Sequence, residues 1–267
     1  MEGNNIHTFN AEGTTLRKTQ LRMLEILKEV DRVCKKYNIP YWLDSGTLIG
    51  AVRHQGFIPW DDDLDIQMLR PDFKRFINIF PRECSQDFVL QTNKTDRNYM
   101  APYAKVRDVH SCISENNDKL DTHYTYKGLY IDIFLLEPSV EKLAVLGRKF
   151  QVVVYYFSVF KTDKYKLKTC FANFVRWIVY NIVFRCFRLF AKMIGSKHLY
   201  HTYGSGFLKY RIKEEIFPLL ELDFEGEKFP APHDYDSFLR RIYGDYMQLP
   251  DLNTVKNHIN KVEFYIE

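Results

Sequence analysis

Four aspartates stand within five positions directly after Trp60, and an apolar alternation begins among them. Successive side chains of a β-strand point to opposite faces, so a strand over Asp63–Met68 directs its three apolar residues into the core. Asp63 and Asp65 then share the other face, with their Cα atoms about 6.6 Å apart, twice the rise per residue. Two like charges on one face repel, and a divalent cation neutralises both. The pattern therefore predicts a metal site.

Two other interpretations remain open when the acids are considered alone. Acidic runs are often solvated turns, and Asp is a poor strand former. A regular calcium loop is a second alternative, but the run lacks the glycine and glutamate that an EF-hand places at positions 6 and 12. The residues on either side of the run favour the metal site.

A small-residue turn, Ser45-Gly46-Thr47, precedes the acids and lies between a predicted strand and a predicted helix. Backbone N–H groups at such a helix start, aided by the helix dipole, favour a bound phosphate. A tight turn with a serine cap is the alternative. Arg53 and His54 follow about two helical turns later and can add positive charge, since arginine suits forked contacts with phosphate.

Two later segments supply further charged groups. Lys105 and Arg107 share one face of a predicted strand over Tyr99–Arg107, where they can hold the phosphates of a nucleotide or pair with acids. Asp132 lies within Gly128–Leu136, a segment apolar enough for a buried central strand. A buried carboxylate needs a partner, either a structural donor or the cation of the acidic strand. We favour the cation, because three carboxylates around Mg²⁺ suit phosphoryl transfer.

Composition narrows the function classes. The chain has 267 residues, 46% of them hydrophobic, and a net charge of +4 that is too small to indicate nucleic-acid binding. Its five cysteines lack CxxC spacing, which favours reduced thiols over zinc ligands or disulfides. We expect no signal peptide and no membrane-spanning helix, and a cytoplasmic location, with the inner face of the membrane left open.

Periodicity predicts four parts: a flexible start over 1–15, a core over 16–139, a helical insert over 140–200 and a C-terminal segment over 201–267 that packs on the core. Around the site, we expect helices and strands at Leu16–Tyr37 (helix), Ile39–Leu43 (strand), Arg70–Phe80 (helix), Asp87–Gln91 (strand) and Tyr235–Tyr243 (helix). Asp223–Pro232 is rich in turn residues.

The insert is rich in aromatic residues interrupted by cations. Arg185, Arg188 and Lys192 fall on one face of a predicted helix. A helical subdomain packed on the sheet is the favoured interpretation, and a surface that docks on anionic membrane is the alternative. His198 and His201, one helical turn apart, can bind a metal in principle, but no further ligand is in sight, so we expect ordinary surface residues.

Several motifs together resemble one family. They lie at Asp44–His54, Phe57–Asp65, Tyr130–Phe134, Phe224–Gly226, Phe229–Pro232 and Tyr243–Met247. In this order they resemble the LicD family of phosphotransferases, which includes fukutin-related proteins. The resemblance implies an α+β fold of the nucleotidyltransferase type, in which helices flank a mixed sheet, with a helical insert.

The resemblance also implies a reaction: transfer of a phospho-substituent of the phosphocholine type from a CDP-linked donor to a cell-surface glycan such as lipopolysaccharide or capsule. Asp63, Asp65 and Asp132 would hold Mg²⁺ or Mn²⁺ and carry the catalysis. Ser45, Gly46, Thr47, Arg53, His54, Lys105 and Arg107 would bind the substrate. Two alternatives remain: a nucleotidyltransferase acting on a sugar or small-molecule hydroxyl, and a metal- or glycan-binding protein without turnover.

Overall fold

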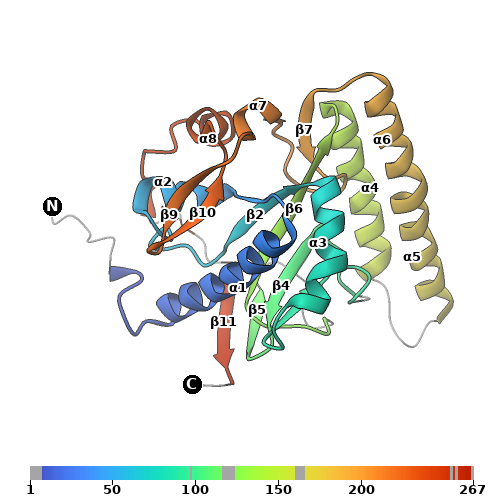
Figure 1. The fold of residues 1–267 in the computed structure, drawn as a ribbon. Helices are drawn as coiled ribbons and strands as arrows, with labels where there is room; N and C mark the ends of the chain where they lie inside the picture. The colour runs from blue at the N-terminus through green and yellow to red at the C-terminus, as the bar shows by residue number, and fades with distance from the viewer. Residues whose placement is uncertain are drawn as a thin grey trace.

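A seven-stranded mixed sheet forms the centre of the protein (Figure 1). The computed structural model describes residues 8–96, 98–115, 124–159, 166–252, 255 and 258–265. Five strands lie in the order β1-β2-β6-β4-β3, and β7 and β8 extend the sheet beside the end of β6. Their bounds are Trp42–Leu43 (β1), Asp65–Leu69 (β2), Phe88–Gln91 (β3), Ala104–Asp108 (β4), Tyr130–Pro138 (β6), His198–His201 (β7) and Arg211–Ile212 (β8). Among the described strands, β2 and β6 are the one parallel pair, so the predicted α+β class with a mixed sheet is confirmed.

Two helices cover one face of this sheet, α1 (Thr15–Tyr37) and α3 (Arg70–Glu83) (Figure 1). The Thr14 hydroxyl caps α1 by accepting a hydrogen bond from the backbone of Arg17, and Asn38 ends it in the left-handed conformation. The apolar side chains of α1 and α3 pack on Ile66, Met68 and the inward residues of β6 in one core cluster. The predicted core side of the acidic strand is therefore confirmed.

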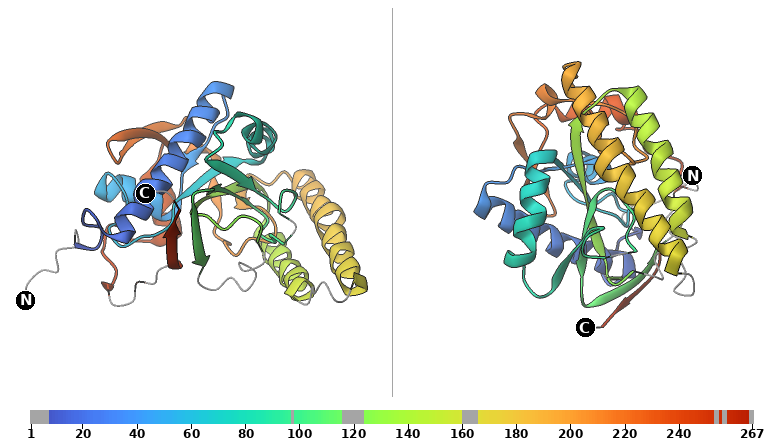
Figure 2. Two further views of the ribbon diagram at one scale, coloured as in Figure 1. Left: turned by 90° about the horizontal axis from the view of Figure 1, so that it is seen from below. Right: turned by 90° about the vertical axis from the view of Figure 1, so that its right-hand side faces the viewer.

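The insert forms a layer of helices at the far edge of the sheet, seen nearest the viewer on the right of Figure 2. It contains α4 (Glu141–Val159), α5 (Lys166–Ile178), a π-helical turn η3 (Val179–Val183) and α6 (Phe184–Met193). A small core of its own joins these helices to the sheet, with Val154, Phe184 and Tyr203 fully buried. Six residues of the insert, 160–165, lie outside the described residues, as do residues 1–7 of the predicted flexible start.

Several predicted boundaries are wrong. The acidic strand begins at Asp65, so Asp63 lies in the loop before it. Tyr99 lies outside β4, and β6 begins and ends two residues later than predicted. The turn-rich segment is a hairpin of β9 (Leu220–Phe224) and β10 (Glu227–Ala231), whose two turn residues both have positive φ.

Other elements had no prediction at all. β5 (Ser111–Glu115) pairs with β11 (Ile259–Phe264), which brings the end of the chain beside its first half. A short helix, α7 (Lys213–Ile216), precedes α8 (Tyr235–Tyr243), the predicted last helix. Among the described residues, no helix is both long and apolar enough to cross a membrane.

One close backbone approach gives a test of this packing. A Cβ atom added at Gly128 would lie 1.7 Å from the carbonyl oxygen of Asp108, so only glycine fits between β4 and the start of β6. We expect Gly128→Ala to lower the free energy of unfolding by about 1–3 kcal/mol, measured by urea denaturation. Gly206→Ala is the matched control, because no atom lies within 4 Å of its added Cβ. Equal stability of the two variants would contradict this account.

Candidate functional site

Two carboxylates meet where the parallel strands of the sheet lie side by side. Asp65 is the first residue of β2 and is paired in register with Asp132 of β6. The backbone N–H of Asp132 donates to the carbonyl of Leu64 at 2.9 Å, which joins β6 to the loop before β2. Both side chains are almost fully buried, at 7% and 9% exposure. The sheet therefore brings together two of the three acids that the sequence predicted as a metal site.

The loop before β2 adds two more acids beside the start of α2 (Ser45–His54). A Cβ atom at Gly46 would lie 2.5 Å from Oδ2 of Asp61 and 3.9 Å from Oδ1 of Asp63. The Asp61 carboxylate therefore lies this close to the first turn of α2 because residue 46 is glycine, whereas Asp63 would be in ordinary contact with a Cβ. Asp63 lies in the loop before β2 rather than on the strand. The side-chain alternation of a strand, from which its position was predicted, therefore does not apply to it.

The acids repel one another in a buried space. Burial, and then the charge of Asp63, raises the pKa of Asp61 and of Asp65 well above the usual carboxyl range; Asp132 adds to the shift at Asp65. Burial also raises the pKa of Asp63. Buried like charges are costly, and a cation among them removes that cost.

Lys105 is the nearest cation to the paired strands. Its Nζ lies 3.2 Å from a carboxylate oxygen of Asp132 and 3.1 Å from the ring centre of Tyr130. The next residue on this face, Arg107, is fully buried and bonds Gln91 and the carbonyl of Gly128. The two cations share a face as predicted, but Arg107 is held within the protein, whereas Lys105 lies at the acids.

Two side chains of the turn that was predicted to hold phosphate, Ser45 and Thr47, make hydrogen bonds within the protein. The Thr47 hydroxyl accepts a hydrogen bond from the backbone N–H of Asp65 at 2.8 Å. Ser45, which has a φ of 51°, donates its hydroxyl to Asp44 at 3.0 Å. Thr47 therefore helps to position the acidic segment, Ser45 bonds its neighbour Asp44, and phosphate binding by this turn stays a prediction.

The cations at the end of α2 contact the C-terminal segment. Arg53 donates to the backbone carbonyl of Tyr246 at 2.8 Å and to Nε2 of His54 at 2.9 Å. The ring of His54 stands edge-on to that of Trp60. Burial lowers the pKa of Arg53. These contacts tie α2 to the chain end, and a role for either residue in substrate binding stays a prediction.

A clamp between Asp62 and His258 was not predicted from the sequence. The Asp62 carboxylate accepts hydrogen bonds from the backbone N–H groups of His258 and Ile259 at 2.9 and 2.8 Å and lies 3.1 Å from the His258 ring nitrogen. The bond to Asp62, together with the nearby charge of Asp63, raises the pKa of His258 to about 9. His258 is therefore a cation at neutral pH. It lies 196 positions from Asp62, so no local pattern could reveal the pair.

A second missed feature is a buried polar network behind the acids. Gln67 donates to Asp44 and lies 2.9 Å from Nε2 of His201, which also contacts Arg211 at 3.2 Å. Burial, and then the charge of Arg211, lowers the pKa of His201 well below the usual histidine range, so the ring is neutral. The predicted helical spacing of His198 and His201 is wrong, because both lie on β7, where residues three apart point to opposite faces.

The donor set fits a hard divalent cation. The groups around the start of β2 are carboxylate oxygens, which Mg²⁺ and Mn²⁺ prefer, and within the described residues no cysteine joins them. A second group of possible ligands, from Asp61, Asp62 and His258, lies beside it, with the ligand atoms within 4.8 Å of one another. Asp62 is already bonded to three groups of the C-terminal segment, which leaves Asp61, Asp63, Asp65 and Asp132 as the carboxylates that could hold a cation.

Comparison with known proteins agrees with this geometry. The family model described as "LicD/FKTN/FKRP, nucleotidyltransferase domain" matches residues 38–142, which include the turn and all the acids of the site. The lipopolysaccharide cholinephosphotransferase LicD of Haemophilus influenzae is 30% identical over 264 residues, 91% of this chain and 96% of that protein. An uncharacterised Rickettsia typhi protein is 43% identical over 77 residues, which cover 29% of this chain and 25% of that one.

A more distant relative is the mouse ribitol-5-phosphate transferase FKTN, which is 28% identical over 108 residues, or 40% of this chain and 21% of that protein. The similarity to the Haemophilus protein extends over nearly the full length of both chains. It therefore extends well beyond the acidic site. This chain belongs to the LicD family of phosphotransferases.

Proposed function

We propose that the protein transfers phosphocholine, or a similar phospho-substituent, from a CDP-linked donor to a hydroxyl group of a cell-surface glycan, with Mg²⁺ or Mn²⁺ as cofactor. The observation that carries the proposal is the convergence of four carboxylates, two of them buried and two partly buried, with raised pKa values at three of them, beside one lysine. Membership of a phosphotransferase family supports the reaction type. The names of the relatives state neither a CDP-linked donor nor a metal, so both belong to the proposal alone.

The roles of the residues follow from their positions. Asp61, Asp63, Asp65 and Asp132 hold the cation, which when bound neutralises charge on the donor's diphosphate. The acceptor oxygen attacks the phosphorus that carries choline, the bond from that phosphorus to CMP breaks, and a carboxylate of the site takes the hydroxyl proton. Lys105 adds positive charge beside Asp132. The products are CMP and a new phosphodiester on the glycan.

Product analysis tests the reaction. With CDP-choline, Mg²⁺ and a glycan fraction from the host, we expect phosphorus NMR to show CMP and a new phosphodiester signal. Asp65→Asn should lower the rate at least about a thousandfold, because it removes charge needed to hold the cation that stabilises the transition state. Transfer of the nucleoside monophosphate to the acceptor would instead establish a nucleotidyltransferase. Ligand binding without any product, also across CDP-ribitol and CDP-glycerol, would establish a binding protein.

Metal binding can be tested without turnover. We expect Mg²⁺ at about 100 times its Kd to stabilise the wild type by about 2.7 kcal/mol in thermal or urea unfolding. Asp65→Asn should not respond. In metal-free buffer at pH 8 this variant should be more stable than the wild type, because one repelling charge is gone while the side-chain volume is nearly unchanged. A variant that is less stable without metal, or equally stabilised by it, would contradict the proposed site.

We further propose that the insert docks on an anionic membrane, where lipid-linked glycans are found. The outer sides of α4, α5 and α6 display most of the exposed large apolar residues of the described chain: Leu146, Val152, Val153, Tyr156, Leu167, Phe171, Phe174, Trp177, Ile182, Leu189, Phe190, Met193 and Ile194. Residues 140–200 contain twelve lysines and arginines but only two acids. That balance suits an anionic surface, and it would set like charges against each other in a dimer of this face.

One residue of the predicted basic face, Arg188, has a different environment from Arg185 and Lys192. Arg188 turns inward and donates to Glu137, at the end of β6, at 2.6 Å, whereas Arg185 and Lys192 are exposed. Arg188 therefore joins the insert to the sheet, and its substitution would test folding as much as membrane binding. The three cations were predicted to fall on one helical face, but helical periodicity does not show what packs against that face, and Arg188 packs against Glu137.

Vesicle flotation tests the docking. We expect binding to vesicles of phosphatidylglycerol and phosphatidylcholine, and weaker binding to phosphatidylcholine alone. Phe174→Glu with Trp177→Glu should lower partitioning at least about tenfold, because two aromatic side chains that are more than half exposed would no longer enter the lipid. Val109→Glu, an exposed apolar residue away from the insert, is the control. Equal partitioning of both variants, or a dimer that dissociates only in the double variant, would contradict the proposal.

A further inference from the structure

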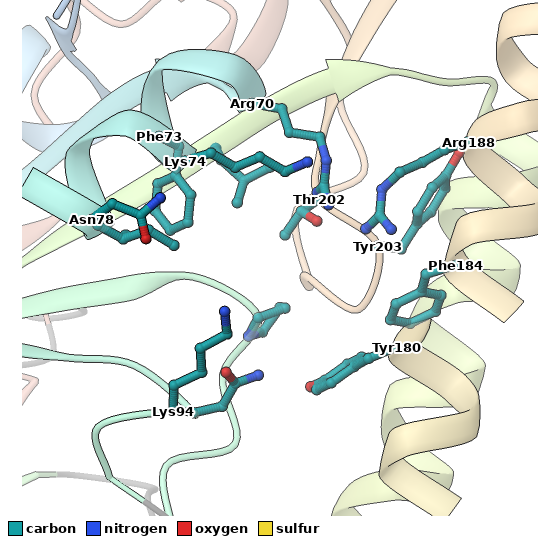
Figure 3. A pocket seen from close by; sticks show the side chains of 14 residues that line it. Arg70, Phe73, Lys74, Asn78, Lys94, Tyr180, Phe184, Arg188, Thr202 and Tyr203 are labelled. Carbon is teal, nitrogen blue, oxygen red and sulfur yellow. The ribbon is translucent and has the colours of Figure 1, made fainter. Parts of the chain in front are cut away.

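A cavity of about 350 Å³ lies between α3 and α6, away from the acidic site (Figure 3). Four cations line it: Arg70 and Lys74 of α3, Lys94 from the loop after β3, and Arg188 of α6. Figure 3 shows these four side chains directed into the space between the two helices. Among the residues that the structure describes, its lining includes no aspartate or glutamate. We call it the basic cavity.

The two arginines are held in place from behind by a single acid. The carboxylate of Glu137 is almost fully buried and lies 3.2 Å from Arg70 and 2.6 Å from Arg188. It also accepts hydrogen bonds from the hydroxyl of Thr202 at 2.8 Å and the backbone of Tyr203 at 3.4 Å. One carboxylate neutralises one of the two guanidinium groups, so the pair keeps a net positive charge. Burial, together with the repulsion from Arg188, lowers the pKa of Arg70, although Glu137 acts in the opposite direction.

Lys74 and Lys94 add positive charge that no acid among the described residues neutralises. No ion pair to Lys74 or Lys94 occurs among the residues that the structure describes, and both are exposed. The same two arginines also border a second cavity of about 310 Å³, which continues toward Lys192. A row of positive groups therefore extends along the inner side of the insert.

The remaining walls of the basic cavity suit an organic group attached to the anion. Phe184 and Tyr203 lie against each other with ring centres 5.6 Å apart, and Phe73 borders the opposite side from α3. Asn78 and Asn93 supply amide groups. Cavities with apolar and aromatic walls and a few convergent polar groups are typical binding sites for small molecules. Forked arginine groups are suited to phosphate oxygens.

The cavity is separate from the proposed donor site because of the pleat of β6. Leu135 lines the basic cavity, whereas Asp132 belongs to the acidic site. Residues three apart on a strand point to opposite faces, so the two sites lie on opposite sides of the sheet. A ligand of the basic cavity is therefore not the diphosphate that the acids would hold through a cation.

We propose that the basic cavity binds a phosphate-bearing ligand on the far side of the sheet from the acidic site. The phosphate lies between the arginine pair and the two lysines, and the attached group contacts the aromatic wall. A phosphorylated sugar and the headgroup of an anionic lipid share this chemistry. The inference does not depend on the proposed function, because neither the metal nor the donor enters it.

Calorimetric titration in metal-free buffer tests the proposal, with glucose 6-phosphate and inorganic phosphate as soluble probes and glucose as the neutral comparison. The variant carries Lys74→Gln and Lys94→Gln, which leave the buried Glu137 contacts intact. Its matched control carries Lys18→Gln and Lys209→Gln, two exposed lysines outside the cavity. We expect glucose 6-phosphate to bind the control protein and wild type equally and the cavity variant at least about tenfold more weakly, since two charged hydrogen bonds are lost. Asp65→Asn should bind like wild type.

The second arm distinguishes the source of the phosphate. If glucose 6-phosphate does not bind but vesicles of phosphatidylglycerol bind the cavity variant at least about tenfold more weakly than the control, the ligand is a lipid headgroup. If neither probe separates the cavity variant from its control, the proposal is wrong. Loss of phosphate binding in Asp65→Asn would also overturn it, because the anion would then belong to the acidic site.

Discussion

Mutual repulsion among buried carboxylates is the constraint on which this site depends. Asp65 and Asp132 are neighbours because β2 and β6 pair in parallel, and Asp61 lies against the α-carbon of Gly46. Each contact brings negative charge into a space with little water, where ionisation is costly. The surrounding fold has to stabilise this arrangement, and it does so with Lys105, with the Thr47 hydroxyl on the backbone of Asp65 and with the protonated His258.

Residues of the C-terminal segment bond to the acidic loop and to α2, which lie in the first third of the chain. His258 and Ile259 hold Asp62, and the Tyr246 carbonyl holds Arg53. Glu225, in the turn of the β9–β10 hairpin, bonds both Arg17 and the backbone of Phe57. The acidic loop is thus enclosed by segments about 200 residues away, which accords with a similarity to the Haemophilus protein over nearly the whole chain rather than over the acidic motif alone.

The insert has two sides with different environments. Its inner side contributes Phe184 and Arg188 to packing and to the basic cavity, whereas its outer side exposes Phe174 and Trp177. The sequence predicted a helical subdomain here, and both of its sides carry aromatic residues and cations. Contacts with Tyr203 and Glu137 decide which aromatic face is buried. Both residues come from other segments, so the sequence of the insert alone does not show which face that is.

The sequence by itself determined the class of fold and the core side of the acidic strand, because apolar alternation is a local pattern. That Asp63, Asp65 and Asp132 together hold a metal stays a prediction. The sequence did not determine that the strand begins only at Asp65. β1 ends at Leu43, opposite Ile66, so on that side no strand pairs with the acids before Asp65, and they form a loop beside α2. The partners that complete the site, Lys105 at Asp132 and His258 at Asp62, were decided by tertiary structure. They lie 27 and 196 positions away, and only the folded sheet and the chain end bring them within bonding distance.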